Sequence, residues 1–178
     1  MAERQVVFVV ASRDYQPIEY QVPKHLLEQS AFTVLTASDV PGTATATDGS
    51  TTQVDLLIDA FDPTEYDAIV FIGGAGSLEH LDNKKSYDVI KKAYDEKIIV
   101  AAICLSTRIL AKSGILKNKK ATGWNEDKEL EEIYKEYGAN YKLSDVVVDG
   151  KIVTAVGPAA AREFAENIIS LLSDKYSK

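Results

Sequence analysis

The chain has 178 residues, of which 46% are hydrophobic, and a formal net charge of −7 at pH 7. This length predicts one globular domain over residues 1–178, and the hydrophobic content excludes a disordered chain. The excess of acidic residues argues against a nucleic-acid partner, and no apolar stretch reaches the ~20 residues that a membrane span requires.

Two features predict a cytoplasmic protein. The strand-like residues 5–11 begin almost at the first residue, which leaves no room for a basic and then apolar secretion signal. Cys104 is the only cysteine, so an intramolecular disulfide is impossible, and the chain suits a reducing compartment.

Continuous apolar runs alternate with helical patterns along the chain. Residues 6–10, 68–72 and 98–103 are apolar at every position, which is typical of parallel strands covered on both faces. Residues 32–36 predict a further strand. The helical patterns cover residues 18–29, 85–96, 104–113, 125–137 and 158–176.

The segment 146–154 differs from the other strands. Its Asp149-Gly150 pair separates two β-branched runs, a pattern that predicts an antiparallel hairpin. Residues 41–62 have weak periodicity and predict a loop with one or two short strands. We therefore expect a three-layer α/β fold, with a mostly parallel sheet, helices on both faces and a small β-hairpin.

Sites in such folds form beyond the carboxyl ends of the strands. Cys104 lies there, at an abrupt change from strand to helix, where a nucleophile sits on a tight turn. Gly73-Gly74-Ala75-Gly76 follows another strand and could offer backbone N–H groups to a ligand. Two alternatives stay open: a buried structural cysteine and a purely structural glycine turn.

A cysteine nucleophile usually has a histidine base, and the chain offers only His25 and His80. His25 belongs to a predicted helix and is expected to face solvent. His80 follows the glycine run and is a possible base. A carboxyl partner is the other candidate, and Glu19, after the first strand, could supply it.

These motifs in this order resemble the DJ-1/PfpI family of the class I glutamine-amidotransferase-like superfamily. The resemblance covers essentially the whole chain and rests on Glu19 with Leu26-Leu27, on residues 66–70 with Gly73-Gly74, and on residues 101–104, 110–116, 119–122, 149–154 and 157–165.

The resemblance implies a flavodoxin-like fold, a homodimer, and no cofactor or metal. It implies a site in which Cys104 is the nucleophile and a protonated Glu19 contacts its sulfur. The backbone N–H groups of Gly74 and Leu105 would be the oxyanion donors, and the turn at the helix N-terminus would favour the thiolate. Gly73, Ala75, Ser106 and Trp124 would line the pocket.

The chain departs from the family at three positions. Leu105 stands where peptidase-like members have histidine, Ser106 replaces the usual glycine, and Trp124 stands where many glyoxalase-like members have histidine. Trp124 either walls the pocket or packs without a role in binding.

Two classes of function stay open. One is a stress-related redox sensor or weak glyoxalase/deglycase-like protein that meets a small carbonyl compound or an oxidant. The alternative is a Cys-dependent hydrolase of peptides or amides, or an isonitrile hydratase-like enzyme.

Overall fold

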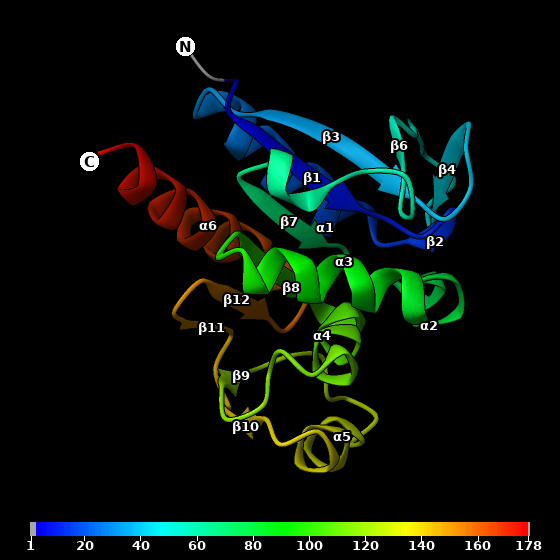
Figure 1. Ribbon diagram of the computed structural model, residues 1–178. Coiled ribbons are helices and arrows are strands. Elements are labelled where there is room, and N and C mark those ends of the chain that lie inside the picture. The colour runs from blue at the N-terminus through cyan, green and yellow to red at the C-terminus, as the bar shows by residue number, and fades with distance from the viewer. Residues whose placement is uncertain (1–2, 178) are drawn as a thin grey trace.

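A computed structural model describes residues 3–177, and its centre is a seven-stranded sheet in the order β11-β12-β8-β7-β1-β3-β6 (Figure 1). The strands are β1 (Gln5–Val9), β2 (Arg13–Tyr15), β3 (Thr33–Ser38), β4 (Thr43–Ala46), β5 (Thr51–Gln53), β6 (Leu56–Leu57), β7 (Ala68–Phe71), β8 (Ile99–Ile103), β9 (Lys120–Ala121), β10 (Asn140–Tyr141), β11 (Val146–Asp149) and β12 (Ile152–Ala155).

The helices are α1 (Pro17–Gln29), α2 (Ala75–His80), α3 (Lys84–Asp95), α4 (Thr107–Ser113), α5 (Leu130–Glu136) and α6 (Ala161–Tyr176). Short 3₁₀ turns occur at Pro63–Glu65, Cys104–Ser106 and Pro158–Ala160.

The middle of the sheet is parallel, as the continuous apolar runs predict. β1 pairs with β3 on one side and with β7 on the other, and β8 lies between β7 and β12, all in parallel register. Every residue of β7 and β8 is buried. Because helices cover both faces, no position on these strands can be polar without a buried partner.

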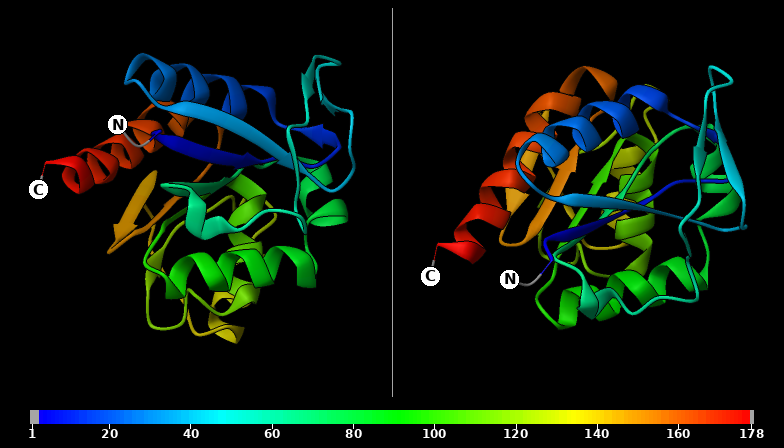
Figure 2. Two further views of the ribbon diagram at one scale, coloured as in Figure 1. Left: turned by 45° about the horizontal axis from the view of Figure 1, so that its top comes forward. Right: turned by 90° about the horizontal axis from the view of Figure 1, so that it is seen from above.

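The sheet forms the middle of three layers. Figure 2 shows α1 and α6 on one face and α3 and α4 on the other. Alternate residues of β1 enter the two cores: Val6 and Phe8 pack on the side of Phe164 from α6, whereas Val7 and Val9 pack with Ile90 from α3. The three-layer α/β expectation is therefore confirmed.

The expected hairpin is present at one edge. β11 pairs with β12 in the antiparallel direction, with Asp149 opposite Ile152, and is the only antiparallel neighbour in the main sheet of the described chain. The turn therefore lies at Gly150, as the Asp-Gly signal predicts.

Residues 11–62 contain more structure than the sequence predicts. The segment between β1 and α1 includes β2, which pairs with β4, and β4 pairs in turn with β5 to form a separate three-stranded sheet. With β6, residues 41–62 hold three short strands instead of one or two. Non-local pairing stabilises these strands, and their polar sequences give no periodic signal.

The helix expected over residues 125–137 is shorter and begins at Leu130. The Asn125 side chain accepts a hydrogen bond from the Leu130 N–H at 3.0 Å, and Asp127 is bound to Arg108. These side-chain contacts hold residues 122–129 as a loop, and this loop contains the predicted pocket residue Trp124.

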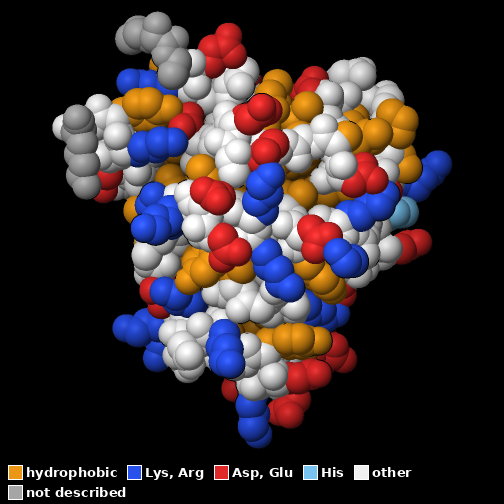
Figure 3. All heavy atoms as spheres, in the orientation of Figure 1, with side chains coloured by type: hydrophobic (Ala, Val, Ile, Leu, Met, Phe, Trp, Pro, Cys, Tyr) orange, Lys and Arg blue, Asp and Glu red, His pale blue; other side chains and the backbone are white. Residues whose placement is uncertain are grey.

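The surface in the orientation of Figure 3 mixes acidic and basic side chains over the face of α3. Several of them pair, such as Lys85 with Asp59 at 2.6 Å and Lys92 with Asp62 at 2.7 Å. Within residues 3–177, no helix is both long enough and apolar enough to cross a membrane.

Candidate active site

Cys104 lies at the sharp turn between β8 and α4. Its φ angle is +62°, a left-handed conformation that costs an L-residue about 1–3 kcal/mol unless its surroundings impose it. The Thr107 hydroxyl donates to the Cys104 carbonyl at 2.9 Å, and the Ser106 hydroxyl donates to Ile72 O at 2.5 Å. These bonds fasten the turn to its own helix and to the end of β7.

Glu19 reaches the same place from the first turn of α1. The Gln16 side chain caps this helix by accepting hydrogen bonds from the N–H groups of Ile18 and Glu19, at 2.6 and 3.2 Å. The Glu19 side chain is fully buried, and its Oε1 accepts a hydrogen bond from the Gly73 N–H at 3.1 Å. Its Oε2 has no hydrogen-bond partner among the described atoms.

Gly73 lies against both the Glu19 carboxyl group and Cys104, and only a residue without a side chain fits there. A Cβ atom on Gly73 would lie 2.5 Å from Glu19 Oε1, 2.6 Å from Cys104 Cβ and 2.8 Å from Ile103 O. No larger residue fits between these groups without displacing them. The glycine after β7 therefore brings the backbone, the carboxyl group and the cysteine into one tight contact.

Burial raises the pKa of both side chains, whereas hydrogen bonds with Cys104 and with the Gly73 N–H lower the pKa of Glu19 by a smaller amount. Burial is the main cause for both, and it raises the pKa of Glu19 to about 8 and that of Cys104 to about 12. The charge of Glu19 raises the pKa of Cys104 further, while the N–H groups of Leu105 and Gly74 lower it.

Both groups are therefore protonated near neutral pH and titrate as a pair. The turn was expected to favour the thiolate, but the loss of hydration at Cys104, only 7% exposed, outweighs the two N–H donors.

A groove of about 560 Å³ opens over Cys104. Most of its surface is apolar, and its lining comes from five separate parts of the chain. The lining residues are Gln16, Cys104, Gly123, Trp124, Asn125, Glu126, Tyr141, Leu143, Val156, Gly157, Pro158 and Ala159. Its size is within the range of small-molecule sites.

The other predicted residues have different positions. Ala75 is exposed at the start of α2 and does not line the groove. His80, the possible base, also lies outside the groove lining, and its Nδ1 is 3.4 Å from Asp39 Oδ2. His25 is exposed on α1. Glu19 is thus the acidic group beside Cys104, and neither histidine lines the groove.

Several groove residues were missed by sequence reasoning. Gly157 and Pro158 follow β12, so the rule that sites form at the carboxyl ends of strands could have found them. Leu143 lies in a polar loop and gave no signal. Among residues 3–177, no cluster of three or more His, Cys, Asp or Glu side chains could hold a metal ion.

Comparison with known proteins gives consistent matches over nearly the full chain. The model of the DJ-1/PfpI family matches residues 4–171. A deglycase of Thermococcus kodakarensis is 30% identical over 93% of this chain and 98% of its own.

Two solved structures have the same fold. A ThiJ/PfpI domain protein from Brachyspira murdochii superposes with a TM-score of 0.91 and 30% identity, covering 98% of this chain and 99% of its own. An oxidised DJ-1 from Toxoplasma gondii has a TM-score of 0.83 and 28% identity, covering 97% and 92%.

Proposed function

This chain belongs to the DJ-1/PfpI family, and we propose that Cys104 and Glu19 form a thiol site that adds to small carbonyl compounds. The observation that carries this proposal is the contact of the buried Glu19 carboxyl group with the thiol of Cys104, which lines the groove and has two backbone N–H groups at its sulfur. A purely structural cysteine would need neither the carboxyl group nor the groove.

The proposed step is the addition of the thiol across a C=O bond. The sulfur–carbon bond forms as the π electron pair moves to the carbonyl oxygen, and the proton that leaves sulfur reaches that oxygen through the carboxyl group of Glu19. The N–H groups of Gly74 and Leu105 would stabilise the developing negative charge. The product is a hemithioacetal or hemithioketal, and Glu19 ends the step protonated as it began.

A relative that is named a deglycase supports carbonyl chemistry for this site. The residues at positions 105 and 124 indicate that this carbonyl chemistry is slow in this chain. Leu105 and Trp124 cannot move protons, and general acid–base help is typically worth ~10²–10⁴-fold in rate. Turnover by this chain would therefore depend on Glu19 alone.

Redox sensing through the same thiol is the second candidate. The observation that favours it is Glu19 Oε2, a buried oxygen without a partner that could donate a hydrogen bond to an oxygen added at sulfur. The similarity to an oxidised DJ-1 structure agrees with this reading. Oxidation proceeds through the thiolate, the form that the N–H groups of Leu105 and Gly74 favour, and it needs access and a donor but no second base.

We also propose a homodimer located in the cytoplasm. The family resemblance suggests the dimer, and the exposed Ile18 on α1 gives one apolar residue that a second copy could cover. The free Cys104 suits a reducing compartment.

Turnover assays on three substrates test the proposal. Methylglyoxal, a peptide amide and an isonitrile would be offered to the wild type, Cys104→Ser and Glu19→Gln, with the exposed Glu28→Gln on the same helix as a control. We expect slow consumption of methylglyoxal that is lost in the first two variants and kept in the control. Turnover of only the peptide or the isonitrile would assign the site to the hydrolase or hydratase class. Methylglyoxal turnover that persists in Cys104→Ser would refute the proposal.

A further inference from the structure

A buried arginine lies directly behind the groove. Arg108 follows Cys104 by four residues on α4, and its side chain is only 5% exposed. Its Nη2 donates to both carboxylate oxygens of Asp127, at 2.7 and 2.8 Å, and to the Trp124 carbonyl at 3.5 Å. Its Nη1 lies 3.5 Å from Glu129 Oε2.

Arg108 fixes the loop over residues 122–129, which has no regular secondary structure. The loop lies against the start of α4. A Cβ atom placed on Gly123 would be only 2.1 Å from Thr107 Oγ1, so the two backbones approach closely there. The guanidinium group of Arg108 is 5.6 Å from the centroid of the Trp124 ring. This distance suits a cation–π contact, so the arginine supports the ring as well as the backbone.

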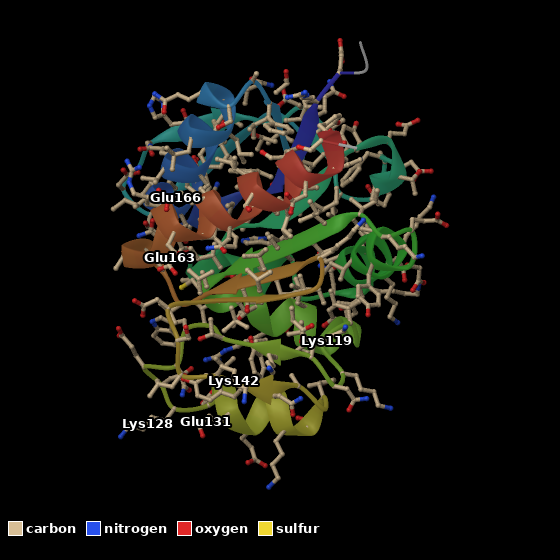
Figure 4. The ribbon with its side chains drawn as sticks, turned by 90° about the vertical axis from the view of Figure 1, so that its left-hand side faces the viewer. Lys119, Lys128, Glu131, Lys142, Glu163 and Glu166 are labelled. Carbon is tan, nitrogen blue, oxygen red and sulfur yellow. The ribbon has the colours of Figure 1, made fainter. Side chains whose placement is uncertain are left out.

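The charge of Arg108 is not offered to a ligand, since Asp127 and Glu129 balance it. Among the residues that line the groove there is no Lys, Arg or His, whereas Glu126 adds a negative charge. In Figure 4, Glu163 and Glu166 lie on α6, and Lys128, Glu131 and Lys142 lie lower in the same view; none of these residues lines the groove. An anionic ligand would therefore enter the groove without a cation to bind it.

The apolar residues of the groove favour a ligand with an apolar part. Trp124, Leu143 and Pro158 line it, and the Leu143 side chain is 94% exposed. A ligand that covered these side chains would gain hydrophobic free energy. The smallest dicarbonyl compounds would leave most of the groove filled with water.

We propose that the groove selects neutral carbonyl compounds that carry a planar apolar group, and that Arg108 is the positioning residue for this selectivity. The planar group stacks on Trp124 while the carbonyl carbon lies at Cys104. The inference rests on the proposed function, because it assumes that Cys104 reacts with electrophiles in the groove.

The chain is suited to a direct test, since it contains one cysteine and one tryptophan, Cys104 and Trp124. Alkylation would be followed by intact mass with iodoacetamide and with N-benzyl iodoacetamide. Each rate is divided by the rate of the same reagent with N-acetylcysteine at the same pH, and the readout is the ratio of the two corrected rates. Stacking on an aromatic ring predicts a ratio of about 2–12 in favour of the benzyl reagent.

Four variants assign the selectivity to its residues. Trp124→Ala and Arg108→Met should bring the ratio close to one, whereas Trp124→Phe should retain most of it. Lys128→Ala changes an exposed residue of the same loop that does not line the groove, and its ratio should equal that of the wild type.

Fluorescence of Trp124 gives an independent readout of the arginine's positioning role. N-benzylacetamide, which cannot alkylate, should change the emission and protect Cys104 from iodoacetamide, whereas acetamide should do neither. Arg108→Met should shift the emission to longer wavelength as the ring becomes more hydrated, and Arg108→Lys should give a smaller shift. If the emission of Arg108→Met is not shifted, Arg108 does not position the Trp124 ring.

The selectivity of the groove and the reactivity of Cys104 are refuted by different results. A ratio near one in the wild type, with normal alkylation by iodoacetamide, overturns the selectivity but leaves the reactive thiol intact. Because the raised pKa of Cys104 slows alkylation, the reactions are also followed over extended times at alkaline pH, and no alkylation by either reagent there overturns the proposed function as well.

Discussion

The buried carboxyl group of Glu19 should make the protein less stable as the pH rises. Glu19→Gln is the informative perturbation, because glutamine keeps an oxygen that can accept the hydrogen bond from Gly73 N–H but cannot ionise. We expect the wild type to lose stability between pH 5 and pH 8 relative to this variant.

The magnitude follows from the pKa of Glu19, which burial raises from 4.5 to about 8. Between these pH values the folded state holds a proton that the unfolded state has released, so stability falls with increasing pH. The contribution is fully present below pH 4.5 and is lost as the pH passes 8. At about 1.4 kcal/mol per pH unit, the greatest loss is about 5 kcal/mol.

Urea unfolding followed by far-ultraviolet circular dichroism at pH 5, 6, 7 and 8 would measure this loss. For a chain of this length, a difference of about 5 kcal/mol corresponds to about 10–20 °C in Tm, so thermal unfolding gives a second measurement. Glu28→Gln, on the exposed side of α1, should follow the wild type. Parallel stability curves for wild type and Glu19→Gln would refute the reasoning, since they would mean that Glu19 ionises as freely in the fold as in water.

Three further predictions concern the same site and the assembly. Gly73→Ala should lower the free energy of unfolding by about 1–3 kcal/mol in urea, whereas Gly157→Ala, whose new Cβ would lie no closer than 4.0 Å to Glu19 Oε2, should be tolerated; equal effects would contradict the packing explanation. Mild peroxide should add two oxygens to Cys104, and Glu19→Leu should make that product less stable, by intact mass; a Cys104 that stays unmodified while a free thiol is oxidised would count against sensing. Light scattering at micromolar concentration should give twice the monomer mass, and a monomer mass would exclude the dimer.

The central sheet was predictable from the sequence because its chemistry is local. Strands covered on both faces must be apolar at every position, so β1, β7 and β8 stand out as continuous runs. The Asp149-Gly150 turn is equally local. The same logic places Cys104 and the Gly73 loop at the carboxyl edge of the sheet, where the ends of parallel strands meet.

The partner of Cys104 was less determined by the sequence. Nothing in the local pattern around Glu19 distinguishes it from other glutamates at the start of a helix. The family resemblance pointed to it, and the fold shows its contact with Gly73 across 54 positions of the chain. The separation of His80 from the groove likewise depends on where α2 ends, which local patterns do not define.

Only the tertiary structure decided the protonation of the pair and the shape of the groove. The pKa of Cys104 depends on how completely water is excluded, and that is a property of packing between β8, α1 and the Gly73 loop. The ion pair of Arg108 with Asp127 fixes the loop of Trp124 through charges 19 positions apart, in a segment with no periodic pattern. The sequence by itself thus determined the sheet and the position of Cys104 at its carboxyl edge, while non-local burial and charge pairing determined the protonation of Cys104 and the shape of the groove above it.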